Sequence, residues 1–289
     1  MELVYQGARG RIVELGAAGL PSGFVLTAAR GLYDTRCDVY AIDPPGQAGA
    51  VWVSSRVARR VITLEGFIAR DVAAGRRRLA SCLSPMEPGW LTLRRVEAEG
   101  LFERRIRCVV ERGPIFGAED GSAFSVTLVA PSPWWEDTGG DSGANLTGWV
   151  GGVAFPWGME EGFQFGGRTP DTAVNVFNPG DALTGLTIRM YAADVVERPY
   201  VARPGTAEAL RVAATLEEGG SIEIGTGAGE KYARRVYADG SVENAMRYID
   251  PDSVFPQLEP GDNLLKAGAV SGGEALTVTL SFRPRYLSA

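Results

Sequence analysis

Four carboxylates and one side-chain amide lie close together in the segment YIDPDSVFPQLEPGDN (248–263). Oxygen ligands of this kind bind Ca²⁺, and a pair of carboxylates can perform acid–base catalysis. A calcium loop of the EF-hand type needs oxygens at alternate positions, a central Gly and a closing Glu, and two prolines interrupt that register here. We therefore interpret the segment as two turns around a short apolar stretch, in which Asp and Asn side chains bond nearby backbone N–H groups. The residues concerned are Asp250, Asp252, Glu259, Asp262 and Asn263.

A second set of residues could bind sugar rings by stacking. The set comprises Trp134, Trp135, Trp149, Phe155, Trp157, Phe163 and Phe165. Large aromatic side chains more often fill a core or a domain junction, because they bury much apolar area there. We place Pro133, Trp134 and Trp135 at a domain junction, and we retain Trp149 and Trp157 as the candidate glycan contacts.

The glycine-rich segment IGTGAGEK (224–231) resembles a phosphate-binding loop only loosely. The pattern GxxxxGK[ST] requires a Gly where Glu230 stands, and a Ser or Thr where Tyr232 stands. A hairpin turn between two strands explains the segment better.

The sequence contains no His, which removes the commonest general base, the commonest zinc ligand and any Ser-His or Cys-His pair. The three cysteines, Cys37, Cys82 and Cys108, are too far apart for a CxxC metal site, and we expect small buried thiols in a reducing cytosol. No catalytic motif, metal site or cofactor site is predicted. The residues therefore favour a structural or binding protein over an enzyme.

The chain has 289 residues, of which 45% are hydrophobic and 22% are charged, enough for one large domain or two domains of typical size. No window approaches the roughly 18 apolar residues of a transmembrane helix, and charges occupy the beginning of the chain where a signal peptide needs an apolar stretch. We expect a soluble protein without an export signal.

Charge is distributed unevenly. Residues 1–133 contain 17 Arg, no Lys and 14 acidic residues, a net charge of +3, whereas residues 134–289 contain 12 basic and 21 acidic residues, a net charge of −9. This asymmetry indicates two units with different surroundings, and it makes the second unit a poor nucleic-acid binder.

Apolar residues alternate with polar ones in several segments of the first half. Residues 60–69 and 122–131 each predict a half-buried strand, and residues 89–113 predict two strands joined by a turn. In the second half the same alternation occurs at 185–192 and in two further segments. The further segments are 221–227 and 274–287, and Gly- and Pro-containing turns separate them. This pattern predicts an antiparallel sandwich.

The segment RDVAAGRRRLASCLSP (70–85) breaks the two-residue period and predicts a helix that Asp71 caps and Pro85 ends. Gly75 weakens this helix by about 1 kcal/mol relative to Ala. The arginines at 76–78 span most of a turn, so they do not all face one groove. We interpret them as a solvated or subunit-facing surface.

The segment APSPWWEDTGGDSGANLTGW (130–149) separates the two halves. Its Pro residues stiffen the end of the preceding strand, and its Gly, Asp and Ser residues are typical of an exposed loop. We place the first domain at 1–133 and the second at 134–289.

Five segments in this order resemble the siphophage distal tail proteins, a phage tail-component family of the tail tip and baseplate hub. They are VITLEGFIARDVAAGRRRLASCLSPMEPGWLTL (61–93), FSVTLVAPSPWWED (124–137), VFNPGDALTGLTIRMY (176–191), YADGSVENAMRYIDPDSVFPQLEPGDN (237–263) and LTVTLSFRPRYL (276–287).

The resemblance implies an all-β fold with one short helix. Residues 1–133 would form the ring-forming domain and residues 134–289 a galectin-like β-sandwich on the outside of the ring. It implies a non-enzymatic structural virion protein at the distal end of the tail, made in the host cytoplasm. The expected partners are further copies in a homohexamer, the tail tube protein, and a tail-associated hub or fibre protein. The tape measure protein is a further candidate, no membrane is involved, and DNA is only cargo in the channel.

An alternative is a carbohydrate-binding protein or a carboxylate-dependent glycosidase that acts on the cell wall. It would need exposed rings such as Trp149 and Trp157 beside an acidic pair, for which Glu160 and Glu161 are the local candidates. Binding to a host cell-surface glycan therefore stays open.

Overall fold

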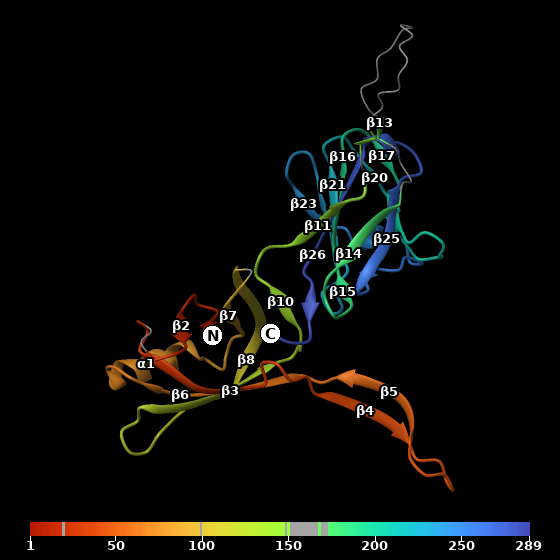
Figure 1. Ribbon diagram of the computed structural model, residues 1–289. Helices are drawn as coiled ribbons and strands as arrows, with labels where there is room; N and C mark the ends of the chain where they lie inside the picture. Colours follow the sequence, from red (N-terminus) through yellow and green to blue (C-terminus); the bar gives the residue numbers. More distant parts are fainter. Residues whose placement is uncertain (19–20, 99, 148, 151–166, 169–172) are drawn as a thin grey trace. The chain divides into compact units, whose positions relative to one another are not determined.

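The computed structural model describes most of the chain in two compact units. The described residues are 1–18, 21–98, 100–147, 149–150, 167–168 and 173–289. Unit 1 comprises Met1–Gly139 and Arg285–Ala289, and unit 2 comprises Gly140–Pro284 (Figure 1). Both chain ends therefore lie in unit 1.

Unit 1 is built on one antiparallel sheet in the order β2-β1-β7-β8-β9-β6-β3. The strands are β1 Glu2–Gln6, β2 Ile12–Leu15, β3 Phe24–Arg30, β6 Arg60–Ile68, β7 Gly89–Glu97, β8 Gly100–Phe116 and β9 Ala123–Ala130. Gly16, which directly follows β2, forms a parallel bridge with Val25 of β3. This bridge joins the two outer strands and closes the sheet around its core.

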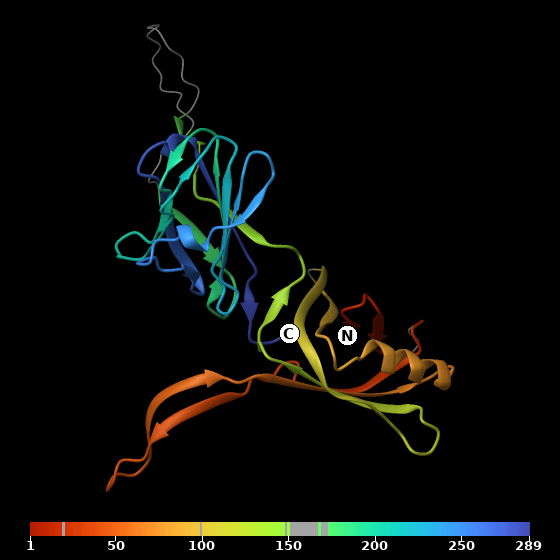
Figure 2. The ribbon, with the colours of Figure 1, turned by 180° about the vertical axis from the view of Figure 1, so that it is seen from behind.

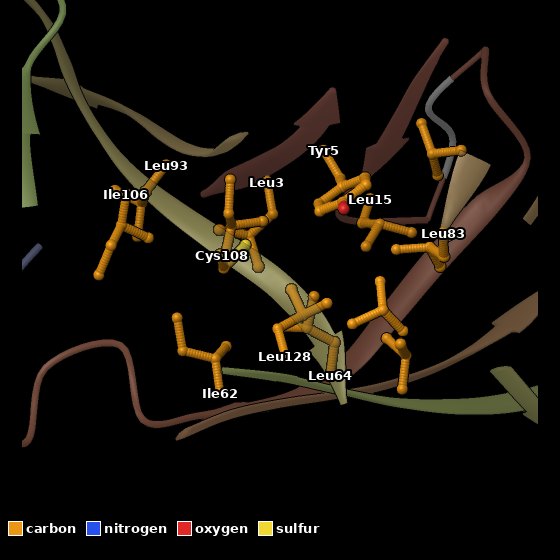
Figure 3. Packing of buried hydrophobic residues seen from close by; sticks show 14 of the residues in the cluster. Leu3, Tyr5, Leu15, Ile62, Leu64, Leu83, Leu93, Ile106, Cys108 and Leu128 are labelled. Atoms are coloured by element: carbon orange, nitrogen blue, oxygen red, sulfur yellow. The ribbon is translucent and has the colours of Figure 1, made fainter. Parts of the chain in front are cut away.

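The core of unit 1 collects side chains from strands that are distant in sequence, such as Leu3, Ile62 and Leu128 (Figure 3). In β6, Ile62 and Leu64 are fully buried while Thr63 is only half-buried. This is the alternation that the sequence predicts, and the strands expected at 60–69, 89–113 and 122–131 are confirmed by β6, by β7 with β8, and by β9.

The predicted helix is confirmed as α1 (Val72–Cys82). The carboxylate of Asp71 accepts a hydrogen bond from the N–H of Ala74 at 3.1 Å. A Cβ atom on Gly75 would lie 2.6 Å from Ile68 Cγ2, so the helix needs Gly there to pack against β6. The close approach to the sheet explains a residue that weakens an isolated helix.

The three arginines of α1 diverge, as predicted. The guanidinium of Arg76 lies 4.8 Å from the ring centre of Phe116, and that of Arg78 lies 5.8 Å from the ring centre of Phe24. Arg78 also donates a hydrogen bond to the carbonyl of Ile12 at 3.0 Å. Two of the three therefore cover core aromatics of unit 1.

The end of the chain completes unit 1. Strand β10 (Trp135–Asp137) pairs with β8 on one side and with β27 (Arg285–Tyr286) on the other. The structural division after Gly139 therefore differs from the sequence boundary after Pro133, because β10 and β27 extend the sheet of unit 1.

Unit 2 contains a six-stranded antiparallel sheet, β11-β26-β16-β21-β22-β23, and a four-stranded one, β14-β25-β18-β19. Their strands are β11 Ser142–Asn145, β14 Val174–Asn178, β16 Thr187–Ala192, β18 Tyr200–Ala202, β19 Ala209–Arg211, β21 Ser221–Gly225, β22 Tyr232–Val236, β23 Val242–Asn244, β25 Gly261–Gly268 and β26 Leu276–Phe282. Short pairs complete the unit: β12 Trp149–Val150 with β13 Gly167–Arg168, β15 Thr184–Gly185 with β24 Gln257–Leu258, and β17 Val196–Glu197 with β20 Thr215–Leu216.

One core lies between these sheets. Ile188 and Met190 of the six-stranded sheet and Val201 and Leu265 of the four-stranded sheet belong to the same buried cluster. The antiparallel sandwich expected for the second half is confirmed, and the chain as a whole is all-β with one α-helix in the described residues. None of the helices in the described part is long and apolar enough to span a bilayer.

Candidate assembly site

A two-stranded hairpin leaves the barrel of unit 1 between β3 and β6. Its strands are β4 (Cys37–Ile42) and β5 (Val51–Val57), which pair with each other and with no other strand of the described chain. Both views show the hairpin, in orange, projecting away from the sheet of unit 1 (Figures 1 and 2). The sequence analysis did not predict it.

Both faces of the hairpin carry apolar side chains. Side chains alternate between faces along each strand, so Val39 and Ala41 share one face while Tyr40 and Ile42 share the other. The register pairs Ala41 with Trp52 and Ile42 with Val51. The six large apolar side chains are exposed to between 50% and 64%. They are Val39, Tyr40, Ile42, Val51, Trp52 and Val53.

Such a hairpin is not expected to stay uncovered. An isolated two-stranded ribbon is marginally stable in water, because nothing packs against either face. Full burial of a Val, Ile or Phe-sized side chain stabilises by about 1.5–3 kcal/mol. Exposed apolar patches of this kind mark interaction surfaces. The exposed apolar hairpin is therefore the candidate assembly site of unit 1.

The base of the hairpin is polar. Arg56 of β5 donates a hydrogen bond to the carboxylate of Asp38 on β4 at 3.0 Å, and this hydrogen bond raises the pKa of Arg56. Arg36 approaches the same carboxylate at 4.0 Å. A hollow of about 690 Å³ lies beside this group and is lined by Arg36, Asp38, Arg56, Arg59 and other residues of unit 1. The contact surface thus changes from apolar at its far end to charged at its base.

Arg60, at the beginning of β6, anchors this base. The residue is 5% exposed, and burial lowers its pKa although the nearby Asp34 opposes this shift. It donates hydrogen bonds to oxygens of Gly31, Leu32, Asp34, Thr35, Pro133 and Leu287. One buried cation therefore connects the entry to the hairpin, the exit from β9 and the C-terminal segment.

The three residues predicted at a domain junction lie in unit 1. Trp135 is fully buried and donates its indole N–H to the carbonyl of Leu32 at 3.2 Å. The carbonyl of Pro133 accepts a hydrogen bond from Arg60 at 3.0 Å, and Trp134 is half-buried. The structure therefore brings two of them to the base of the hairpin.

The candidate glycan contacts are not brought together by the described structure. The backbone of Trp149 lies in β12, opposite Arg168 of β13. Trp157, Glu160 and Glu161 lie outside the described residues.

The acidic segment at 248–263 forms a turn at Pro251–Asp252, as predicted, but its last three residues, Gly261–Asn263, already belong to β25. A carboxylate oxygen of Asp250 accepts the N–H of Asp252 at 3.0 Å. The buried side chain of Asn263 accepts the N–H of Glu259 at 2.9 Å and donates to the carbonyls of Glu259 and Gly261 at 2.8 and 3.0 Å. Among the described residues, no group of three or more His, Cys, Asp or Glu is placed to hold a metal ion.

The glycine-rich segment is also a turn. It connects β21 to β22, which pair from Ser221 with Val236 to Gly225 with Tyr232. The predicted hairpin is confirmed.

The expectation of buried thiols is correct for two of the three cysteines. Cys82 and Cys108 are buried, and burial raises the pKa of Cys108 to about 12. Cys37 is exposed, because it lies at the beginning of the projecting hairpin rather than in a core. The prediction is therefore wrong for Cys37.

These observations define a two-unit all-β protein whose first unit carries an exposed apolar hairpin. The model of the C-terminal domain of the siphovirus-type tail component matches residues 179–286. Comparison with curated protein sequences finds no match.

Two solved structures share the fold. The crystal structure of the SPP1 Dit protein, described as a paradigm of the hub adsorption apparatus in phages that infect Gram-positive bacteria, is similar over 99% of both chains, with a TM-score of 0.70 and 14% identity. The phage p2 baseplate in its activated conformation with Sr contains a chain similar over 100% of this chain and 99% of that chain, with a TM-score of 0.50 and 10% identity.

At these identities the structural matches show the fold, and the family model supplies the sequence relationship. The predicted resemblance to the siphophage distal tail proteins is confirmed by sequence over 179–286 and by fold along the chain.

Proposed function

We propose that the protein assembles through unit 1 into a closed homohexameric ring at the distal end of the tail. The ring joins the tail tube to the host-recognition proteins of the tip. The observation that carries this proposal is the hairpin β4–β5, whose two faces are apolar and uncovered in the single chain.

A second copy of the chain is the occupant that this surface fits best. The hairpin projects from one place in unit 1, so a neighbour that covers it uses a different part of its own surface. Such a contact is heterologous, and heterologous contacts that close generate rings. Covering both faces of a ribbon requires a neighbour that wraps it or receives it between two surfaces.

The remaining partners follow from the family resemblance. The tail tube protein contacts one side of the ring, and a hub or fibre protein contacts the other, with the tape measure protein as a further candidate. The protein works by binding and not by catalysis, and DNA passes only as cargo through the channel. In this proposal residues 1–133, completed by β10 and β27, form the ring domain, and the remaining chain forms the sandwich domain.

Mass photometry and negative-stain microscopy of the purified chain test the proposal. We expect rings of six copies in the wild type, and a shift to monomers in the double variant Ile42→Ser and Trp52→Ser, since each substitution removes about 1.5–3 kcal/mol of burial at every contact. The matched control is Val270→Ser, which changes a side chain of unit 2 that is 66% exposed, and which we expect to leave the rings intact.

Two results contradict the proposal. One is a wild-type chain that stays monomeric at micromolar concentration, even beside its tail partners. The other is a double variant that still forms rings of the same size and stability.

A further inference from the structure

The central strand of the six-stranded sheet has two chemically distinct faces. Ile188, Met190 and Ala192 point into the core of unit 2 and are fully buried. Thr187, Arg189 and Tyr191 point to the outer face of the same sheet. Arg189 is exposed, and Tyr191 is 40% exposed. One strand therefore presents a hydroxyl, a guanidinium and an aromatic ring side by side.

Arg189 belongs to a polar row that crosses the whole sheet. The strand register places one outward side chain from each of the six strands in this row, and adjacent strands lie about 4.8 Å apart. The row runs Asn145, Thr279, Arg189, Glu223, Arg234 and Asn244. All six have hydrogen-bonding side chains.

One end of the row is held rigidly. The hydroxyl of Tyr232 donates to Glu223 Oε1 at 2.8 Å, and Arg234 forms an ion pair with the same oxygen. Burial opposes ionisation of Glu223, but these hydrogen bonds and the charges of Arg234 and Arg189 outweigh it and lower the pKa of Glu223. A Cβ atom on Gly225 would lie 2.3 Å from the ring of Tyr232, so Gly at this position lets the ring lie flat on the sheet.

Arg189 acts on Glu223 only through its charge, which helps to lower the pKa of that carboxyl group. Within the described residues its guanidinium has no hydrogen bond or ion pair, because Glu223 is already bonded by Tyr232 and Arg234. The row carries two cations and one anion at neutral pH. Unit 2 as a whole carries 11 basic and 19 acidic residues, so this positive row stands out in an acidic unit.

We propose that the outer face of the six-stranded sheet is a binding site for an acidic polysaccharide. The planar guanidinium of Arg189 fits a carboxylate through two parallel hydrogen bonds. The hydroxyl and amide side chains of the row can donate to and accept from sugar hydroxyls. The ring of Tyr191, two positions along the same strand, offers an apolar surface for a sugar ring.

Two other classes of ligand fit this face less well. A protein partner would require large apolar side chains at the centre of its contact. On β11, β26, β16 and β21, however, the outward positions are small or polar, except Tyr191. A single-stranded nucleic acid is bound by several aromatic rings on which its bases stack and by a groove of cations along its backbone, whereas the outward positions of these four strands offer one ring, Tyr191, and one cation, Arg189. A sugar chain needs only one guanidinium for a carboxylate and one ring for a stacked sugar.

The test is calorimetric titration of the full-length protein with the hexasaccharide of galacturonic acid and with its neutral methyl ester. We expect saturable binding of the acid and at least about tenfold weaker binding of the ester, because the ester cannot form the charge-assisted hydrogen bonds. Arg189→Ala should weaken binding of the acid by a similar factor, and Arg189→Lys should bind between these limits. Tyr191→Ala should also weaken binding.

The other sheet of unit 2 supplies matched controls. Arg211→Ala and Phe177→Ala remove an exposed cation and an exposed ring from β19 and β14, and should leave binding unchanged. Thermal unfolding of each variant checks that the sandwich is intact.

Four results overturn the proposal: no saturable binding of the hexasaccharide, equal binding of its ester, equal loss in the control variants, or preferential binding of a DNA oligonucleotide of equal charge. Ring formation, measured by mass photometry, should be the same in Arg189→Ala and in the wild type. A failure of this site is therefore distinguishable from a failure of the ring.

Discussion

The hairpin β4–β5 and the six-stranded sheet of unit 2 both have exposed faces, but the side chains on these faces differ. The hairpin carries large apolar side chains on both faces, among them Trp52 and Ile42. The sheet buries one face and presents a polar row around Arg189 on the other. The sheet therefore has a core on one side, whereas the hairpin has none on either side within the described chain.

The difference follows from what anchors each element. Core side chains hold β16 in place, so its outer face is free to carry any residue type that water tolerates. The hairpin has no core side, and only its base is fixed, through the buried Arg60. Apolar residues on such a ribbon destabilise the free chain and stabilise the assembly. An exposed apolar ribbon therefore favours assembly, whereas an exposed polar sheet face is compatible with solvent.

The largest effect is expected on the buried face of the sheet. Met190→Ala removes a fully buried side chain from β16 and should lower the free energy of unfolding of unit 2 by about 2–5 kcal/mol. Thr187→Ala, on the outer face of the same strand, should change it by less than about 0.5 kcal/mol. Urea denaturation followed by tryptophan fluorescence and circular dichroism measures both. Equal changes in the free energy of unfolding in the two variants would show that the inner face of β16 does not stabilise unit 2 more than its outer face.

An intermediate effect is expected in the backbone of the hairpin. In dilute monomer, amides of β4 and β5 should exchange with solvent much faster than those of β16, because their hydrogen bonds are exposed and nothing packs on them. Assembly should slow exchange in the hairpin by about tenfold or more and leave β16 unchanged. Exchange measured by mass spectrometry below and above the assembly concentration makes the comparison. A hairpin that is already protected in the monomer would remove the reason to expect a partner.

The smallest effect is expected from the polar row. The pKa of Glu223 is lower in the folded protein than its ordinary value of 4.5, so its stabilising contribution is present above about pH 4.5 and is lost as the pH falls through the lowered value. Glu223→Gln should therefore reduce the loss of stability of unit 2 between pH 7 and pH 3. The exposed Glu217→Gln serves as the control and should keep the wild-type pH dependence, as followed by urea denaturation. Identical pH profiles for wild type and Glu223→Gln would show that the row does not stabilise the sheet.

Alternation and capping signals predicted the helix and the strands with one clearly buried face. Strands β6, β16 and β26 each bury one face against a core, so apolar residues alternate with polar ones along them. The helix α1 was recognisable from its cap Asp71 and from the break in the two-residue period. The turn character of 248–263 followed from the short side chains of Asp and Asn, which bond backbone groups close by.

The hairpin β4–β5 was missed because its residues do not alternate. Apolar side chains occupy both faces, and this removes the signal on which a strand with one buried face is recognised. The available signal was a run of β-branched and aromatic residues on each side of the turn-forming PPG at 44–46. The absence of alternation is itself the sequence feature that distinguishes this hairpin from a strand with one buried face.

The polar row could not be predicted from the sequence either, because it joins residues of different strands. Alternation in 185–192 shows that Thr187, Arg189 and Tyr191 share a face, but it does not show which residues of other strands stand beside them. The neighbours of Arg189, namely Thr279 and Glu223, come from segments 90 and 34 residues away in sequence. Strand order and register decide such neighbours.

By itself, the sequence determined the strands with one buried face, where the helix lies and that the chain resembles a phage tail component, because these depend on local period, turn residues and segment order. Only the tertiary structure decided that Gly16 and β3 close the barrel and that β27 returns to unit 1. It also decided that the hairpin is uncovered and that Arg189 forms no hydrogen bond within the described residues. Each of these depends on contacts between residues far apart in the chain, which local patterns do not specify.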